Sequence, residues 1–107
     1  MIKVLAVGLM AFALNSTPSH AGFFSGNELV ELCRGERGLC NFYVTGLFDS
    51  WSSYGGGMLF CVDNNVRLSQ IVDLTLEYIR RNPAERHEAA AHMLTRALAE
   101  AFPCKNN

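Results

Sequence analysis

Four cysteines constrain the fold of this sequence more than any other feature: Cys33, Cys40, Cys61 and Cys104. A chain of 107 residues buries only a modest hydrophobic core, so a domain of this size often needs cross-links to stay folded. An even number of cysteines without a Cys-x-x-Cys pair favours two disulfide bonds over a metal site, if the chain reaches an oxidising compartment. Disulfide formation therefore depends on whether the protein is exported, and the N-terminal part of the sequence bears on this.

The N-terminal segment has the pattern of an export signal. Lys3 precedes an apolar run over residues 4–14 that is too short to span a bilayer, and the stretch "SHA" at residues 19–21 offers small residues where a signal peptidase cuts. We expect residues 1–21 to be a signal peptide that is removed after Ala21. The alternative interpretation is an N-terminal membrane anchor or a buried helix. All four cysteines lie in the part that would be exported.

The first half of the exported part contains two predicted helices. Ser25 and Glu28 form the pattern of a capping box, and Gly35 is a typical end for the short helix that follows. Apolar residues at 3.6-residue spacing predict a second helix over about residues 39–53. Gly46 lies inside this helix at a cost of about 1 kcal/mol relative to alanine, so we expect another element to pack closely against it.

The second half contains two more predicted helices. Residues 58–66 fit a short extended piece with an Asn-Asn turn, and they signal a two-strand hairpin only weakly. An amphipathic pattern predicts a third helix over about residues 68–81. A fourth should occupy residues 82–102, with Asn82 as its cap and Pro83 in its first turn.

These helices form one predicted domain over residues 22–107: a small all-α bundle of four helices, or five, pinned by disulfides. Because the third and fourth helices should form an antiparallel hairpin, the end of the chain returns toward the start of the third helix. This favours a Cys61–Cys104 bond and leaves Cys33–Cys40 to join the first two helices. A crossed pairing such as Cys33–Cys61 remains an alternative.

The stretch "HEAAAH" resembles the His-Glu-x-x-His pattern of zinc proteases, but its spacing argues against a metal site. In that pattern the two histidines are four residues apart and share one helix face, whereas His87 and His92 are five apart. On a continuous helix they would point about 140° apart. We expect His92 to belong to a polar row with Glu88 and Arg96, and His87 to pack nearer the buried side.

The remaining residues point to no catalytic or cofactor site. The cysteines are expected in disulfides, no Ser-His-Asp arrangement or phosphate-binding loop is evident, and Asp49 is interpreted as a structural or exposed residue. Lys and Arg total 9 against 10 Asp and Glu, and the charges are interspersed, so we expect no nucleic-acid partner. We also expect no cofactor, no metal, no enzymatic activity and no membrane association once the signal is removed.

The order of motifs along the chain resembles the Rap/Tai family of immunity proteins. The resemblance covers essentially all of the exported part. It is carried by "SGNELVELC", by the spacing Cys40, Tyr43, Gly46 and Asp49, and by the later stretches "LSQIVD", "YIRRNPAERHEAAA" and "AFPC".

The resemblance implies a small helical protein of the bacterial periplasm. Characterised members of that family bind and inhibit peptidoglycan amidase toxins delivered by type VI secretion, and dimers are known among them. For this chain it therefore implies a protein toxin as partner, an action by occluding the toxin's active site, and a homodimer as a further state. The alternative function is a periplasmic binding or stress-related helical protein with no toxin partner.

The loop after the second helix supplies the candidate contact residues for such a partner. Tyr54, Met58 and Phe60 flank three glycines, and aromatic and methionine side chains often anchor protein interfaces. Core packing is the alternative for Tyr54 and Phe60, and it is the preferred interpretation for Trp51.

Overall fold

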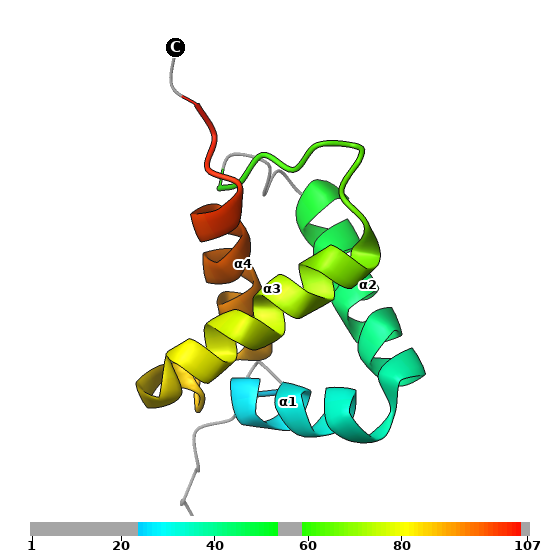
Figure 1. Ribbon diagram of the computed structural model, residues 1–107, viewed down its shortest axis with the longest axis vertical. Coiled ribbons are helices and arrows are strands. Elements are labelled where there is room, and N and C mark those ends of the chain that lie inside the picture. The colour runs from blue at the N-terminus through cyan, green and yellow to red at the C-terminus, as the bar shows by residue number, and fades with distance from the viewer. Residues whose placement is uncertain (1–23, 54–58, 106–107) are drawn as a thin grey trace, which may run out of the picture.

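The computed structural model describes residues 24–53 and 59–105, and the regular structure in these ranges is helical (Figure 1). The candidate signal peptide lies outside the described residues. In Figure 1, α3 crosses diagonally in front of the other helices, and it packs most extensively against α4. The predicted all-α bundle is confirmed. Its elements are α1 (Gly26–Gly35), α2 (Arg37–Ser53), α3 (Leu68–Arg81), the short 3-10 helix η2 (Pro83–Glu85) and α4 (Ala90–Ala101).

The hydrophobic core lies where α3 crosses the other three helices. Each helix contributes the apolar side of its surface, and the largest fully buried apolar side chains are Leu29, Val44, Val72, Ile79, Met93, Leu94 and Leu98. Thr75 is buried among them without loss of a hydrogen bond, because its hydroxyl donates to the Ile71 carbonyl oxygen at 2.8 Å. Thr75 is therefore a polar residue that the core accommodates with its hydroxyl paired.

The start of α1 is fixed by its own sequence. The Ser25 Oγ accepts a hydrogen bond from the Glu28 amide at 3.2 Å, and the Glu28 carboxylate accepts one from the Ser25 amide at 2.8 Å. The predicted capping box is thereby confirmed. Only Glu36 separates α1 from α2, and across this corner the buried Cys33 is bonded to the buried Cys40, with Cα atoms 4.7 Å apart.

The second disulfide closes the opposite end of the molecule. Cys61 is bonded to Cys104, with Cα atoms 4.9 Å apart, and the Cys61 amide donates to the Phe102 carbonyl oxygen at 2.8 Å. Both bridges are the pairs that the sequence favours. The described residues 59–67 form a loop with a turn at Asn64 and Asn65 and do not pair as a hairpin. This loop is thus tied to the end of α4.

The prediction of a continuous fourth helix from Asn82 is wrong for residues 82–89. Instead of starting at Asn82, the chain makes the short helix η2 and a turn, and α4 begins only at Ala90. The cause is a contact between distant parts of the chain: Ala90 donates its amide to the Phe24 carbonyl oxygen at 2.8 Å, and Glu88 accepts from the Gly26 amide at 2.9 Å. The first bond satisfies the free amide of Ala90 at the start of α4, and the second satisfies that of Gly26 at the start of α1, so the Glu88 backbone pairs with α1 and not within a helix of its own.

The close helix contact expected at Gly46 is also corrected. Gly46 is exposed, and a Cβ atom built on it would meet no heavy atom within 4 Å. The close contact occurs at Gly26, where a Cβ atom would lie 3.1 Å from the Arg86 carbonyl oxygen and 3.2 Å from the Met93 Cγ. Only a glycine allows the segment before α4 to approach the first turn of α1 this closely.

Alanine at these two glycines should change stability in opposite directions. Gly46→Ala should raise the free energy of unfolding by about 1 kcal/mol, because alanine loses less backbone entropy in a helix and its methyl group enters open space. Gly26→Ala should lower it by about 1–3 kcal/mol, because the Arg86 carbonyl is backbone and cannot move aside freely. Urea denaturation followed by circular dichroism measures both changes, and equal stabilisation of both variants would contradict the packing at Gly26.

Candidate functional site

The predicted contact residues fall into three structural classes. Trp51 is half-buried and packs against the core, which agrees with the preferred interpretation. Phe60 is only 5% exposed, and its ring stacks on that of Phe48 with centroids 6.1 Å apart. Its assignment as a contact residue is therefore corrected to a core residue, because burial against α2 removes it from a partner's reach. Tyr54 and Met58 lie outside the described residues.

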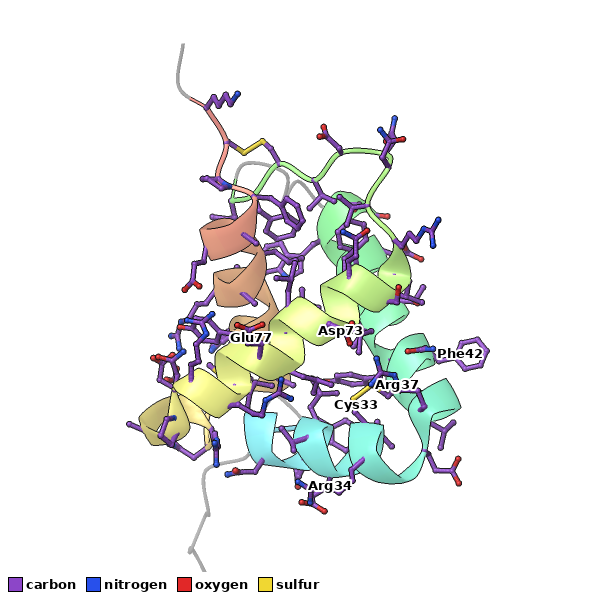
Figure 2. All side chains as sticks on the ribbon, in the orientation of Figure 1. Cys33, Arg34, Arg37, Phe42, Asp73 and Glu77 are labelled. Carbon is purple, nitrogen blue, oxygen red and sulfur yellow. A yellow bond between two sulfur atoms is a disulfide. The ribbon has the colours of Figure 1, made fainter. Side chains whose placement is uncertain are left out.

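The most exposed apolar surface in the described ranges is on α2. Leu39 is 55% exposed and Phe42 is 78% exposed, and they lie three residues apart on one side of the helix. The buried residues Cys40 and Val44 each stand two positions from Phe42, which places them on the opposite side at 100° per residue. Figure 2 shows the Phe42 ring projecting away from the body of the protein. We call Leu39 and Phe42 the α2 ridge.

The α2 ridge has the properties of a protein-binding surface. Two large apolar side chains are exposed on the same side of the helix, and aromatic side chains are enriched among interface anchors. Gly46 lies one helical turn beyond Phe42 with open space above it, so a partner can approach the backbone there. Phe42 is not among the contact residues that the sequence predicts. One feature of the sequence could have indicated its exposure: Phe42 does not lie on the apolar stripe of α2, so its ring does not face the core.

A polar network holds η2 and the start of α4 against α3. Arg96 donates to Glu85 at 2.6 Å and makes two hydrogen bonds to Glu88, at 3.0 and 3.1 Å. These bonds hold the pKa of Glu88 below its ordinary value. Tyr78 donates its hydroxyl to Glu85 at 3.0 Å, and burial, followed by this hydrogen bond, raises the pKa of Tyr78. The charged groups of this network form hydrogen bonds with one another, which favours a structural role for them.

The two histidines of "HEAAAH" do not lie on one helix. His92 is in α4, whereas His87 is in the turn before it and is exposed, which corrects its expected position near the buried side. The His92 Nδ1 lies 4.0 Å from Glu88, so its nearest polar neighbour is the expected one. Within residues 24–53 and 59–105, no three His, Cys, Asp or Glu side chains are grouped closely enough to hold a metal ion. Asp49 is exposed on α2.

A search for membrane-spanning segments found none among the helices of the described ranges. In a comparison with protein families, residues 25–104 match the model described as Rap1a immunity proteins. No curated protein and no solved structure matched this chain. The matched region begins at the N-cap of α1 and ends at Cys104, so it contains every helix of the described residues and both disulfides. Because the match spans well over half of the chain, this protein belongs to the family of Rap1a immunity proteins.

Proposed function

We propose that this protein neutralises a peptidoglycan amidase toxin in the periplasm by binding it and occluding its active site. The observation that carries the proposal is the family match over residues 25–104, since immunity proteins act by binding a toxin. The amidase and the periplasm come from the motif resemblance. Two disulfides among the described cysteines fit folding in an oxidising compartment.

The mode of action is stoichiometric binding without catalysis. A rigid surface loses little conformational entropy on binding, and the α2 ridge is rigid because Cys40 ties the start of its helix to α1. Phe42 is the proposed anchor, inserted into an apolar pocket of the toxin. Tyr54 and Met58, which follow α2 in the sequence, remain proposed contacts, together with the neighbouring Leu59, which is 47% exposed.

Export should decide whether the protein protects a cell. In the experiment, an amidase toxin encoded beside this protein is directed to the periplasm and co-expressed with one of two forms of this protein. One form is complete and the other lacks residues 1–21. The complete form should restore growth, because both the disulfides and the toxin's substrate lie outside the inner membrane. The truncated form should not, and its accumulation is checked by immunoblotting.

Three other results of this experiment would redirect the assignment. Protection by the truncated form would contradict action in the periplasm. Failure of both forms against every neighbouring cell-wall hydrolase would favour a periplasmic binding or stress-related protein with no toxin partner. Catalytic turnover of the toxin, measured as neutralisation at far below equimolar amounts, would contradict inhibition by occupancy. Sedimentation of the purified protein tests the proposed homodimer separately.

A further inference from the structure

A groove of about 480 Å³ lies between α1 and α3, and arginine side chains dominate its lining. Arg34, Arg37, Arg80 and Arg86 face it, with Glu31 as the only acidic residue of that lining. The chain as a whole carries nearly equal numbers of acidic and basic residues, so this is a local concentration of positive charge. Arg37 is labelled in Figure 2, beside Cys33 and Asp73. The groove shares no lining residue with the α2 ridge.

The charges of the groove are only partly neutralised by the protein itself. Arg34 pairs with Glu31 at 2.8 Å, and Arg37 pairs with Asp73 at 3.0 Å; all four side chains are at least half exposed. Such exposed pairs are weak and exchange readily for a better partner. Among the described residues, the Arg80 guanidinium has no hydrogen-bond or ion-pair partner. Arg80 is therefore available to a ligand without breaking any contact.

Arg86 is held in place by the end of α3. Its Nε donates to the Ile79 carbonyl oxygen at 3.0 Å, and its Nη2 donates to the Arg80 carbonyl oxygen at 3.2 Å. Carbonyl oxygens at a helix end attract a cation but do not cancel its charge, so Arg86 supplies a fixed positive charge beside Arg80. Two guanidinium groups without a carboxylate partner are thus brought to one side of the groove.

The rest of the groove is partly apolar, and its lining also includes the polar Asn27 and the acidic Glu31. Val30 of α1 and Leu76 of α3 line it, and so does Cys33, whose sulfur is bonded to Cys40. A ligand that fills the groove must therefore offer both carboxylates and aliphatic surface. Guanidinium groups bind carboxylates through two parallel hydrogen bonds, which gives them a preference for acidic side chains in planar, directional contacts.

We propose that the groove between α1 and α3 binds a segment of the protein partner in which acidic and aliphatic residues alternate. The proposal rests on the proposed function for the existence of a protein partner, and on the groove for the chemistry of the bound segment. The positive groove attracts an acidic segment more strongly than the other surfaces of a partner, and this attraction also accelerates association. The toxin is then held by two separated contacts: Phe42 as an apolar anchor and the groove as an acceptor of carboxylates.

The test uses a fluorescein-labelled peptide of alternating glutamate and leucine, with a lysine–leucine peptide of equal length as its counterpart. Fluorescence anisotropy with the oxidised exported form should show binding of the glutamate peptide alone, weakening as salt is raised. Arg80→Gln should reduce the affinity roughly tenfold, because one charge-assisted contact is lost. The matched control is Arg67→Gln, an exposed arginine at the start of α3 that does not line the groove. Neither variant should lower the melting temperature.

Several outcomes would overturn the proposal. The first is a double variant, Arg34→Gln with Arg80→Gln, that binds the glutamate peptide with the same affinity as the parent protein. Displacement of the peptide by millimolar inorganic phosphate would indicate a small-anion site instead of a peptide groove. Recruitment of the protein to phosphatidylglycerol vesicles through Arg80, without peptide binding, would assign the groove to a membrane surface. Because the peptide assay needs no toxin, peptide binding without protection of cells would leave the groove assignment standing and reject the proposed function.

Discussion

Replacing Cys61 and Cys104 together by serine should lower the free energy of unfolding by about 4 kcal/mol, from loop-closure entropy alone. The bridge spans a sequence separation of 43 residues, so its removal greatly expands the unfolded ensemble. Cys61 is exposed and Cys104 is only partly covered, so the serine hydroxyls meet water and add little cost in the folded state. Urea denaturation should show a lower midpoint together with a steeper dependence on denaturant, since more surface becomes exposed on unfolding.

The controls separate the cross-link from the loop around it. Asn64→Ser changes an exposed residue of the same loop and should alter stability by less than about 0.5 kcal/mol. Reductant should destabilise the parent while leaving a variant without cysteines unchanged. A loss below about 1 kcal/mol in the Cys61 and Cys104 variant would mean that the folded loop is strained by the bridge or that the unfolded chain is already compact.

The shorter bridge should contribute less through the unfolded state and more through packing. Its separation of 7 residues corresponds to about 2.5 kcal/mol of loop-closure entropy. Cys33 and Cys40 are both buried, so their replacement by alanine also removes contacts from the core. Together the two bridges approach the total stability of a small domain, about 5–15 kcal/mol. We therefore expect a chain that stays reduced to be largely unfolded.

Phe42→Ala should weaken toxin binding by about 2–4 kcal/mol, which is roughly a 30-fold to 1,000-fold increase in Kd. The side chain is 78% exposed in the free protein, so its truncation should leave the melting temperature unchanged. Leu68→Ala is the matched control: Leu68 is also an exposed apolar residue, at 36%, but it lies on α3. Isothermal titration calorimetry with the toxin measures the two affinities.

The pattern of results identifies which surface meets the toxin. Unchanged affinity for Phe42→Ala, with weakened binding for Tyr54→Ala or Met58→Ala, would move the contact from the α2 ridge to the loop after α2. Conversion of a dimer to a monomer by Phe42→Ala, with toxin affinity retained, would show that a second copy of the chain covers the ridge. Equal losses for Phe42→Ala and Leu68→Ala would indicate a broad contact without an anchor.

The features that sequence predicted well depend on neighbours along the chain. The pair Ser25 and Glu28 starts α1 because each side chain bonds the other's backbone within one turn. The predicted bounds of α3 coincide with the observed ones because its two faces differ strongly in polarity. The disulfide pairing followed from the hairpin of α3 and α4, and that hairpin survives although its second helix begins late.

The features that sequence missed depend on contacts between distant residues. No residue near Ala90 indicates that the Ala90 amide bonds the Phe24 carbonyl oxygen. The predicted helix therefore starts too early, at Asn82. Phe60 follows a glycine-rich stretch of sequence, and only the folded chain brings it against Phe48. Phe42 could be placed off the apolar stripe of α2, but whether another helix would cover it was not decided by local pattern. The arginine groove likewise joins residues from separate parts of the chain.

The order of the cysteines has a consequence for how the protein matures. Each bridge joins two cysteines that are consecutive in the chain, Cys33 with Cys40 and then Cys61 with Cys104. A polypeptide that crosses a membrane N-terminus first and is oxidised as it emerges pairs each cysteine with the next one to arrive. If the protein is exported as proposed, sequential oxidation would give the native connectivity, and we then expect a disulfide oxidant to suffice without an isomerase. In that case the second bridge could form only after Cys104 has emerged.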